Sequence, residues 1–176
     1  MVAIALLRAI NVGGRNKLPM AQWKSICESL GLSNVRTYIQ SGNAAFEISK
    51  ADLKSLTERM EEAIEKACGF RPPVIVRTQQ EVVEVVRRNP FAGRTDLTPG
   101  YLLVNFLPSQ PTSDAISEAL KLAEPFPEEL HVLGREIYTY YPNGRGTTKL
   151  PTARIERLLG SGTERNWNTV QILTTL

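Results

Sequence analysis

Apolar residues occupy both odd and even positions from Val2 to Ile10, where large and small side chains alternate. This pattern predicts a central β-strand that is buried on both faces. A polar segment follows from Asn11 to Leu18, and Pro19 suits the first position of a helix. The apolar residues that follow have helical spacing and predict a helix that ends at Gly31; they are Met20, Trp23, Ile26, Cys27 and Leu30.

Two short alternating segments, 35–40 and 43–48, predict a β-hairpin with a two-residue turn at Ser41-Gly42. The turn sets a register in which Gln40 faces Asn43. In that register the apolar residues separate onto one face of the hairpin and most polar residues onto the other.

The same register places Arg36 opposite Glu47 and predicts a cross-strand ion pair. The alternative is that Arg36 lies beside Tyr38 on an open sheet face, where RNA-binding domains of ferredoxin-like fold stack bases on aromatic side chains. Only one tyrosine, Tyr38, lies on that predicted face, and the chain lacks the sequence motif of the RNA-binding domains. Both observations argue against such a domain.

A second helix is predicted from Leu53 to Ala67, preceded by Ser49 and Asp52 in the spacing of a capping box. A strand at 74–78 leads through a capping box, Thr78 with Glu81, into a short helix that ends near Asn89. The glycine- and proline-containing segment 90–100 is the predicted internal boundary.

The second half of the chain repeats the first in part. Strands are predicted at 101–107, 129–134 and 136–141, and helices at 112–123, 151–159 and from about 166 to 173. We therefore expect an α+β protein with two ferredoxin-like (split βαβ) halves packed together, residues 1–92 and a partial second half at 93–176 that ends in helices. One continuous mixed sheet covered by helices is the alternative.

Composition makes this chain of 176 residues an ordinary globular protein, with 42% hydrophobic and 22% charged residues. No apolar run is long enough to cross a membrane, and Arg8 interrupts the apolar start, which argues against a signal peptide. Cys27 and Cys68 fall in predicted helices without metal-ligand spacing, so a reducing cytoplasm is the expected location. With His131 as the single histidine, we predict no metal site, no serine–histidine triad and no cofactor.

Basic residues gather toward the two ends of the sequence. Residues 1–46 contain five basic residues and one acidic residue, and residues 142–176 contain five basic and two acidic residues. If the ends meet in space they form a basic cleft, for which phosphates and carboxylates are the expected partners. A solvated surface without a ligand is the alternative.

Two glycine-containing segments end in Lys-Leu-Pro directly before a predicted helix. The first runs from Gly13-Gly14 through Lys17 to Pro19, and the second from Gly144 through Lys149 to Pro151. Glycine permits close backbone approach, and a helix start offers free N–H groups, so each segment is a candidate anion site. Neither is a Walker loop, and two unrelated helix starts that both use proline remain the alternative.

Other polar residues complete the candidate ligand site. Arg8 ends an apolar strand near the first glycine segment, and Arg165 precedes the last helix, which Asn166 or Asn168 is expected to cap. The full candidate set is Arg8, Asn11, Gly13, Gly14, Lys17, Arg36, Tyr38, Gln40, Ser41, Asn43, Lys149, Arg165 and Asn166.

Three motifs carry a resemblance to a known family: Ala5-Leu6-Leu7-Arg8-Ala9-Ile10-Asn11-Val12-Gly13-Gly14 with Asn16-Lys17-Leu18, Arg36-Thr37-Tyr38-Ile39-Gln40-Ser41-Gly42-Asn43, and Thr163-x-Arg165-Asn166-Trp167-Asn168-Thr169. In these the chain resembles the bacterial family called domain of unknown function 1697, over nearly its whole length. The resemblance implies an α+β protein built on ferredoxin-like units and implies no activity. The chain departs from the family pattern at Ala9, where glycine is usual, and at Ala44-Ala45, where valines are usual.

The sequence supports three functions and names no reaction. The first is binding of a phosphorylated or anionic ligand (a nucleotide, sugar phosphate or nucleic acid) in the basic cleft. The second is a small-molecule enzyme with its site at the Ser41-Gly42-Asn43 turn. The third is an interaction module that forms a homodimer through sheet faces; no membrane partner is expected.

Overall fold

The computed structural model describes all 176 residues and divides the backbone into two compact units. Unit 1 consists of Met1–Val83 together with Leu173–Leu176, and unit 2 of Glu84–Ile172. No helix in either unit has the length and apolar character needed to cross a membrane.

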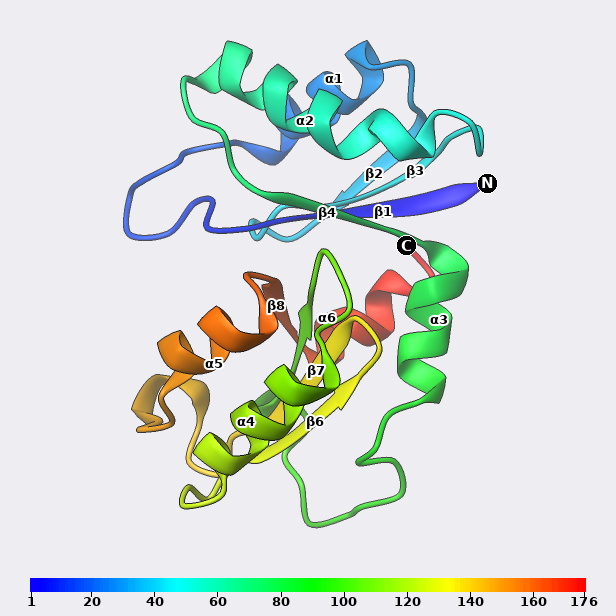
Figure 1. Cartoon of the computed structure of the whole chain (residues 1–176). Helices are drawn as coiled ribbons and strands as arrows, with labels where there is room; N and C mark the ends of the chain where they lie inside the picture. The colour runs from blue at the N-terminus through cyan, green and yellow to red at the C-terminus, as the bar shows by residue number, and fades with distance from the viewer. The chain divides into compact units, whose positions relative to one another are not determined.

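Unit 1 contains one four-stranded antiparallel sheet in the order β2-β3-β1-β4. Its elements in chain order are β1 (Val2–Leu7), α1 (Met20–Ser29), β2 (Ser33–Tyr38), β3 (Asn43–Glu47), α2 (Leu53–Cys68) and β4 (Val74–Thr78). This is the ferredoxin-like βαββαβ arrangement that the sequence predicts. Helices α1 and α2 lie side by side over one face of the sheet (Figure 1).

The core of unit 1 forms between that sheet face and the two helices. It is built from alternate strand residues and from the helical positions at which the apolar pattern recurs, among them Ala5, Leu7, Trp23, Phe46 and Met60. Every residue from Ala3 to Leu7 is buried, as expected for a strand that is apolar on both faces. The capping box at the end of β4 is confirmed, because the Thr78 hydroxyl accepts from the Glu81 N–H at 3.2 Å while the Glu81 carboxylate accepts from the Thr78 N–H at 2.7 Å.

Unit 2 holds a second four-stranded antiparallel sheet, in the order β6-β7-β5-β8. Its strands are β5 (Leu102–Phe106), β6 (Glu129–Leu133), β7 (Glu136–Tyr140) and β8 (Thr163–Asn166). Its helices are α4 (Ser113–Ala123), α5 (Thr152–Leu159) and α6 (Trp167–Leu173), with short 3-10 turns η1 (Pro99–Tyr101) and η2 (Arg145–Thr147). Helix α3 (Gln79–Arg87) crosses the division between the units.

The predicted α+β class with two ferredoxin-like halves is confirmed, and one detail of the second half differs. Strand β8 was not predicted, so the second half is a complete βαββαβ unit rather than a partial one. The strand pairs with β5, Leu103 lying opposite Asn166 and Phe106 opposite Thr163. Its buried residues, Thr163 and Arg165, are polar, and therefore the strand has no apolar alternation for a sequence pattern to show.

The predicted register of the first hairpin is wrong by two residues. Tyr38, not Gln40, lies opposite Asn43, and the turn therefore contains four residues, 39–42. Arg36 lies opposite Ala45 rather than Glu47, so the predicted cross-strand ion pair is absent. A bulge between Ser33 and Arg36 shifts the register again toward the start of β2.

Candidate functional site

The segment between β1 and α1 forms a small β-hairpin of its own. Val12 and Arg15 form a β-bridge, and the Arg15 N–H donates to the Val12 carbonyl at 3.0 Å. Gly13 and Gly14, the two residues between them, have φ values of +57° and +76°. Positive φ at both central residues of a two-residue turn is the pattern of type I′, which favours glycine. The turn geometry is thus sufficient to explain the glycine pair.

Asn11 fixes this small hairpin to the β2–β3 turn. Its side-chain amide donates to the carbonyl oxygens of Leu18 and Gln40, each at 2.9 Å, and its Oδ1 accepts from the Leu18 N–H at 2.8 Å. Asn16 adds a bond from its side-chain amide to the Ala9 carbonyl at 3.0 Å. Two of the three polar segments singled out from the sequence therefore lie together in unit 1.

The β2–β3 turn is packed closely against the end of β1. The Leu7 N–H donates to the Gly42 carbonyl at 3.1 Å, and a Cβ atom at Gly42 would lie 2.7 Å from Leu7 Cβ and from Ile10 Cδ1. Asn43 is fully buried, and its amide donates to the Tyr38 carbonyl at 2.9 Å and to Ser41 Oγ at 3.0 Å. Asn43 thus braces the turn from inside.

This bracing weakens the case for Ser41 as a nucleophile. A serine nucleophile needs a neighbouring general base, and the one histidine of the chain, His131, belongs to unit 2. There His131 lies edge-on to the Phe91 ring, with ring centroids 5.1 Å apart. The enzyme hypothesis therefore gains no catalytic pair from the structure.

Backbone strain is concentrated in the same two segments. Five non-glycine residues have a positive φ, and four of them belong here: Ala9, Asn11, Asn16 and Ile39, at +54°, +54°, +50° and +51°. Asparagine tolerates this conformation, whereas a β-branched isoleucine rarely adopts it. Ala9, one of the departures from the family pattern, is thus at a position that glycine would occupy with less strain.

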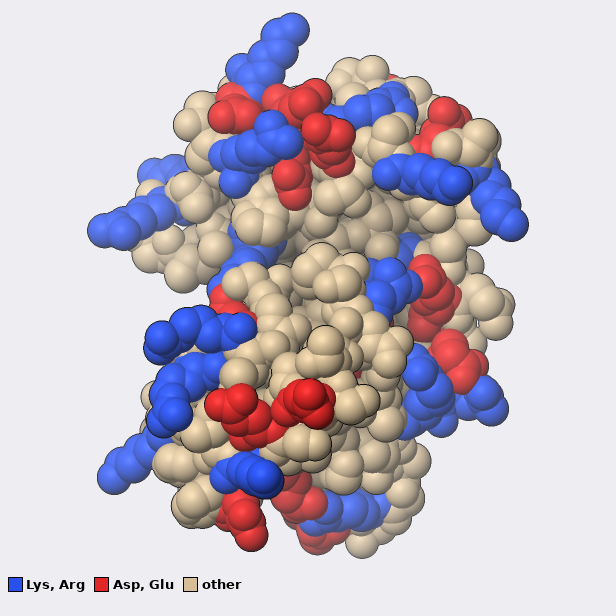
Figure 2. All heavy atoms as spheres, in the orientation of Figure 1, with Lys and Arg blue, Asp and Glu red and all other residues tan.

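The small hairpin exposes positive charge in a part of the sequence that has no acidic residue. Arg15 and Lys17 are exposed and form no ion pair, and the first acidic residue of the chain is Glu28. Over the loop that projects from unit 1, Figure 2 shows Lys and Arg side chains and no Asp or Glu. Arg8 is partly exposed, and its N–H donates to the Pro73 carbonyl at 3.0 Å.

The remaining candidates of unit 1, Arg36 and Tyr38, lie on β2. The Arg36 guanidinium donates to the backbone oxygen of Leu176 at 2.7 Å, so the last residues of unit 1 supply the partner that Glu47 was expected to provide. Tyr38 is half-buried.

Lys149, Arg165 and Asn166 belong to unit 2. Asn166 caps the N-terminus of α6, because its Oδ1 accepts a hydrogen bond from the Thr169 N–H at 2.9 Å. Of the two capping residues that the sequence offers, Asn166 and Asn168, the first is therefore the one used. Arg165 is 6% exposed and donates to Thr163 Oγ1 and to the Glu164 carbonyl, both at 2.8 Å. Burial lowers the pKa of the Arg165 guanidinium to about 10, which leaves it charged at neutral pH.

The repeated Lys-Leu-Pro sequence has a packing explanation. Pro19 and Pro151 are the N-cap residues of α1 and α5, and the leucine before each is buried. Leu18 lies in one core with Trp23, and the leucine before Pro151 lies in the other core with Ile155. Each pair has the spacing of a hydrophobic staple, which fixes the direction in which the chain enters the helix. The lysines themselves are exposed.

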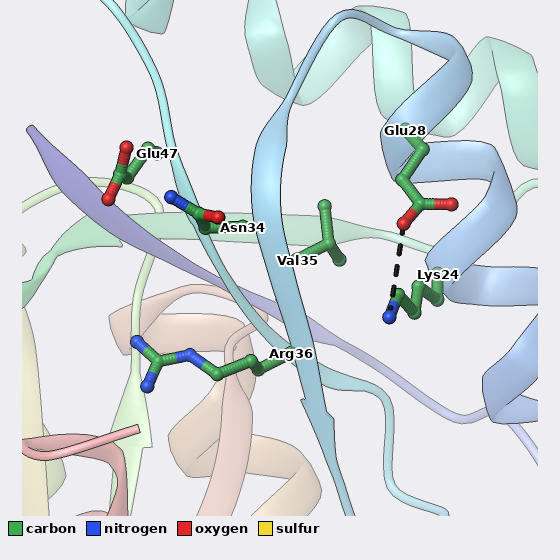
Figure 3. Close-up of a pocket in the computed structure, with 6 residues that line it drawn as sticks. All are labelled: Lys24, Glu28, Asn34, Val35, Arg36 and Glu47. Atoms are coloured by element: carbon green, nitrogen blue, oxygen red, sulfur yellow. Dashed lines mark ion pairs between the residues drawn. The ribbon is translucent and has the colours of Figure 1, made fainter.

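An open groove beside β2 was not foreseen from the sequence. It has a volume of about 620 Å³ and is lined by Lys24, Glu28, Asn34, Val35, Arg36 and Glu47 (Figure 3). Of these six residues, only Arg36 belongs to the candidate ligand site predicted from the sequence. The lining includes Asn34, which lies in the bulge of β2 with a φ of +52°, and no sequence motif marks that bulge.

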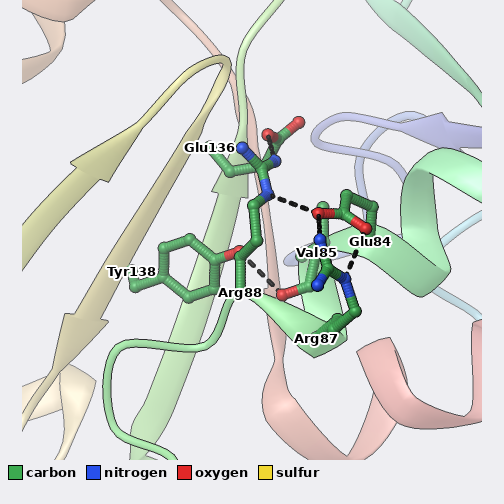
Figure 4. A network of polar contacts seen from close by, with 6 residues as sticks. All are labelled: Glu84, Val85, Arg87, Arg88, Glu136 and Tyr138. Atoms are coloured by element: carbon green, nitrogen blue, oxygen red, sulfur yellow. Dashed lines mark hydrogen bonds and ion pairs between the residues drawn. The ribbon is translucent and has the colours of Figure 1, made fainter.

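A cluster of charged residues in unit 2 has a structural role. Arg88 pairs with Glu136 at 3.3 Å and with Glu84 at 3.7 Å, while the Tyr138 hydroxyl donates to the Val85 carbonyl at 2.8 Å (Figure 4). Burial raises the pKa of Tyr138, so the phenol stays neutral and is unsuited to act as a base. These contacts hold the end of α3 against β7. No group of three His, Cys, Asp or Glu side chains in the protein could hold a metal ion.

Comparison with known proteins supports the fold and identifies the family. The chain is similar to the conserved bacterial protein SP0830 from Streptococcus pneumoniae, with 22% sequence identity, a TM-score of 0.69, and coverage of 99% of this chain and 97% of that one. None of the curated proteins matches the chain. Residues 1–138 match a family described as a protein of unknown function, DUF1697. Since that match covers more than half of the sequence and includes the first two motifs, the chain belongs to the DUF1697 family, as the resemblance predicts.

Proposed function

We propose that the protein binds a phosphate-bearing ligand at the small hairpin between β1 and α1. The observation that carries this proposal is the pair Arg15 and Lys17: both are exposed, neither has an ion pair, and no acidic residue precedes Glu28 in the sequence. Arginine and lysine are the side chains that proteins use most to bind phosphate, arginine as a bidentate hydrogen-bond donor and lysine as a point charge.

The backbone of the hairpin adds donors to this charge. The N–H groups of Gly13, Gly14 and Lys17 donate to no group of the protein. Helix α1, which follows directly, has no side-chain cap and no acidic residue in its first turn. Free backbone N–H groups beside cationic side chains favour an anion with several oxygen atoms, such as a phosphate group.

Rigidity supports the same proposal. A flexible loop loses binding free energy when a ligand orders it. Here the hydrogen bonds of Asn11 and Asn16 hold the hairpin in place before any ligand arrives. The strain at Ala9 and Ile39 is of the kind that proteins keep at ligand sites.

Thermal melting with a ligand panel tests the proposal. The panel contains inorganic phosphate, a nucleoside monophosphate, a sugar phosphate and single-stranded RNA, at low and high salt. A ligand present at about 100 times its Kd adds ~2.7 kcal/mol to the stability. For a chain of this size that corresponds to a rise in Tm of roughly 5–10 °C. The ligand that acts identifies the source of the phosphate, and high salt should reduce the shift.

Two double variants separate this site from a general effect of positive charge. Arg15→Gln/Lys17→Gln should abolish the shift, whereas Lys50→Gln/Lys54→Gln, which also removes two exposed charges from unit 1, should keep it. The proposal fails if no phosphate compound raises Tm, or if the Arg15 and Lys17 variant responds as the control does.

A further inference from the structure

Two large apolar side chains are exposed at the end of unit 1 where β1 finishes. Val12, in the small hairpin, is 66% exposed and is the most exposed large apolar residue of the chain, and Ile39, in the β2–β3 turn, is 46% exposed. The bond from the Asn11 amide to the Gln40 carbonyl joins the two loops at the sequence neighbours of these residues. Figure 1 shows both loops at the same end of the unit 1 sheet. Apolar side chains kept in water on adjoining loops indicate a surface for a partner.

Ile39 is held in an unfavourable backbone conformation. Its φ is +51°, whereas β-branched residues rarely adopt the left-handed region. Asparagine or glycine would relieve this strain and would also remove an apolar side chain from water. Stability and solubility therefore both favour another residue at this position. Strain of this kind is kept where the side chain has a use outside the fold.

Positive charge lies directly beside these side chains. Val12 and Arg15 are cross-strand partners in the small hairpin. Directly opposed residues of an antiparallel pair point to the same face, with Cβ atoms about 5 Å apart. The Arg15 side chain therefore leaves the hairpin on the same face as Val12, and Lys17 follows two residues later. No acidic residue precedes Glu28 in the sequence, so this segment itself contributes no repulsion to an anionic partner.

A lipid bilayer surface provides both parts of this chemistry. Its headgroup phosphates lie over the acyl chains, so a loop that pairs cations with the phosphates brings neighbouring apolar side chains into the interface. In a nucleic acid the phosphates alternate with polar sugars, and single strands bind by stacking their bases on aromatic side chains. The exposed side chains here are aliphatic, and Tyr38, the aromatic residue next to Ile39, is half-buried. The bilayer is therefore the better match.

From these observations we infer that the small hairpin and the β2–β3 turn dock together on an anionic lipid bilayer. Arg15 and Lys17 pair with headgroup phosphates, and Val12 and Ile39 enter the interface beneath them. Docking at the surface needs no membrane-spanning helix. The inference rests on the proposed function, since the same two cations bind the phosphate. It replaces the expectation, drawn from the sequence, that the protein has no membrane partner.

Co-sedimentation of the full chain with vesicles tests this docking. The probes are vesicles of phosphatidylcholine alone and vesicles of phosphatidylcholine mixed with phosphatidylglycerol. The protein should bind the mixed vesicles at low salt and dissociate from them at high salt. Arg15→Gln/Lys17→Gln should lower the partition coefficient roughly 25-fold, since each basic residue near an anionic surface contributes about fivefold. Equal binding to the two kinds of vesicle, or binding to neither, would overturn the inference.

A second pair of variants tests the apolar contribution separately. Val12→Ser/Ile39→Asn keeps every charge and should weaken vesicle binding roughly tenfold. Because asparagine relieves the strain, the Tm of this variant should stay level or rise, which separates lost binding from lost folding. Val83→Ser/Leu120→Asn removes two exposed apolar side chains elsewhere and should bind as the unchanged protein does. Equal binding by these two double variants would refute the role of Val12 and Ile39.

The bilayer inference and the proposed phosphate site fail in different ways. A rise in Tm with a soluble phosphate compound, without vesicle binding, overturns the bilayer and leaves the phosphate site standing. A response to single-stranded RNA in place of vesicles has the same meaning and makes nucleic acid the partner. An absence of any response, to vesicles or to phosphate compounds, overturns both.

Discussion

Gly42 lies at the junction that brings two polar segments together, and its replacement by alanine tests this junction directly. The residue has a φ of +82°, and an added Cβ would lie 2.7 Å from both Leu7 and Ile10 side-chain atoms. Gly31 has a nearly identical φ of +83° with no atom within 4 Å of the added Cβ. The two substitutions share the backbone strain and differ only in packing.

The expected cost follows from these two contributions. Alanine in the left-handed region costs roughly 1–2 kcal/mol, and an extra methyl group in a filled core costs about 1–3 kcal/mol. Restriction of the unfolded chain by alanine offsets about 0.4–1 kcal/mol. Gly42→Ala should therefore lower the free energy of unfolding by about 2–4 kcal/mol, and Gly31→Ala by about 1 kcal/mol.

Urea unfolding followed by tryptophan fluorescence measures this difference. Trp23 is buried in the core of unit 1 and Trp167 belongs to unit 2, so a Trp167→Phe background leaves one reporter, in the unit that contains both glycines. Each glycine variant is compared with that background at equal m-value. If Gly42→Ala is no more destabilising than Gly31→Ala, the close packing of the turn against β1 is refuted.

Three further changes have defined outcomes. Asn11→Gly keeps the left-handed backbone but removes three side-chain hydrogen bonds. It should lower the free energy of unfolding by about 1–3 kcal/mol and accelerate hydrogen exchange at the Leu18 N–H. Unchanged exchange would contradict the role of Asn11 in holding the two segments together. Tyr138 has a pKa raised by burial, so its contribution to stability is complete below the unfolded value of about 10 and is lost at higher pH. Tyr138→Phe should make the loss of stability above pH ~10 less steep, and an unchanged slope would count against burial of the phenol. Asn166→Ala should cost ~1 kcal/mol through the cap of α6, measured by urea unfolding against Asn168→Ala as control, and equal effects would argue against the cap.

The sequence is most informative where side-chain pattern alone decides the structure. The apolar periodicity of the strands and helices predicts the order of elements in unit 1 because each element buries one face or stripe. The hairpin register is not decided in this way. A shift of two residues returns every side chain to the same face, so the separation of apolar and polar residues cannot detect it. The left-handed Ile39 that lengthens the turn runs against the preference of the residue.

The candidate site shows the same limit. The polar segments are visible in the sequence, and their use of glycine and asparagine is typical of turns. Their meeting depends on a bond from Asn11 to Gln40, residues 29 positions apart, which only the folded chain brings together. The groove beside β2 is lined by residues of three elements, among them a residue of the β2 bulge, and these residues form no sequence motif. Pattern recognition therefore finds the residues of a loop more readily than the residues of a groove.

The return of the last residues to unit 1 has a consequence for folding. Unit 1 is discontinuous: Gln79 donates to the Thr174 carbonyl at 3.0 Å and Arg36 to Leu176 at 2.7 Å, across sequence separations of 95 and 140 residues. During synthesis these bonds wait until all of Glu84–Ile172 has left the ribosome, although every strand of unit 1 emerges first. Unit 2 is contiguous, so its contacts span shorter stretches of sequence. Unit 1 therefore gains these two contacts only after the last residues are made, although its strands are made first.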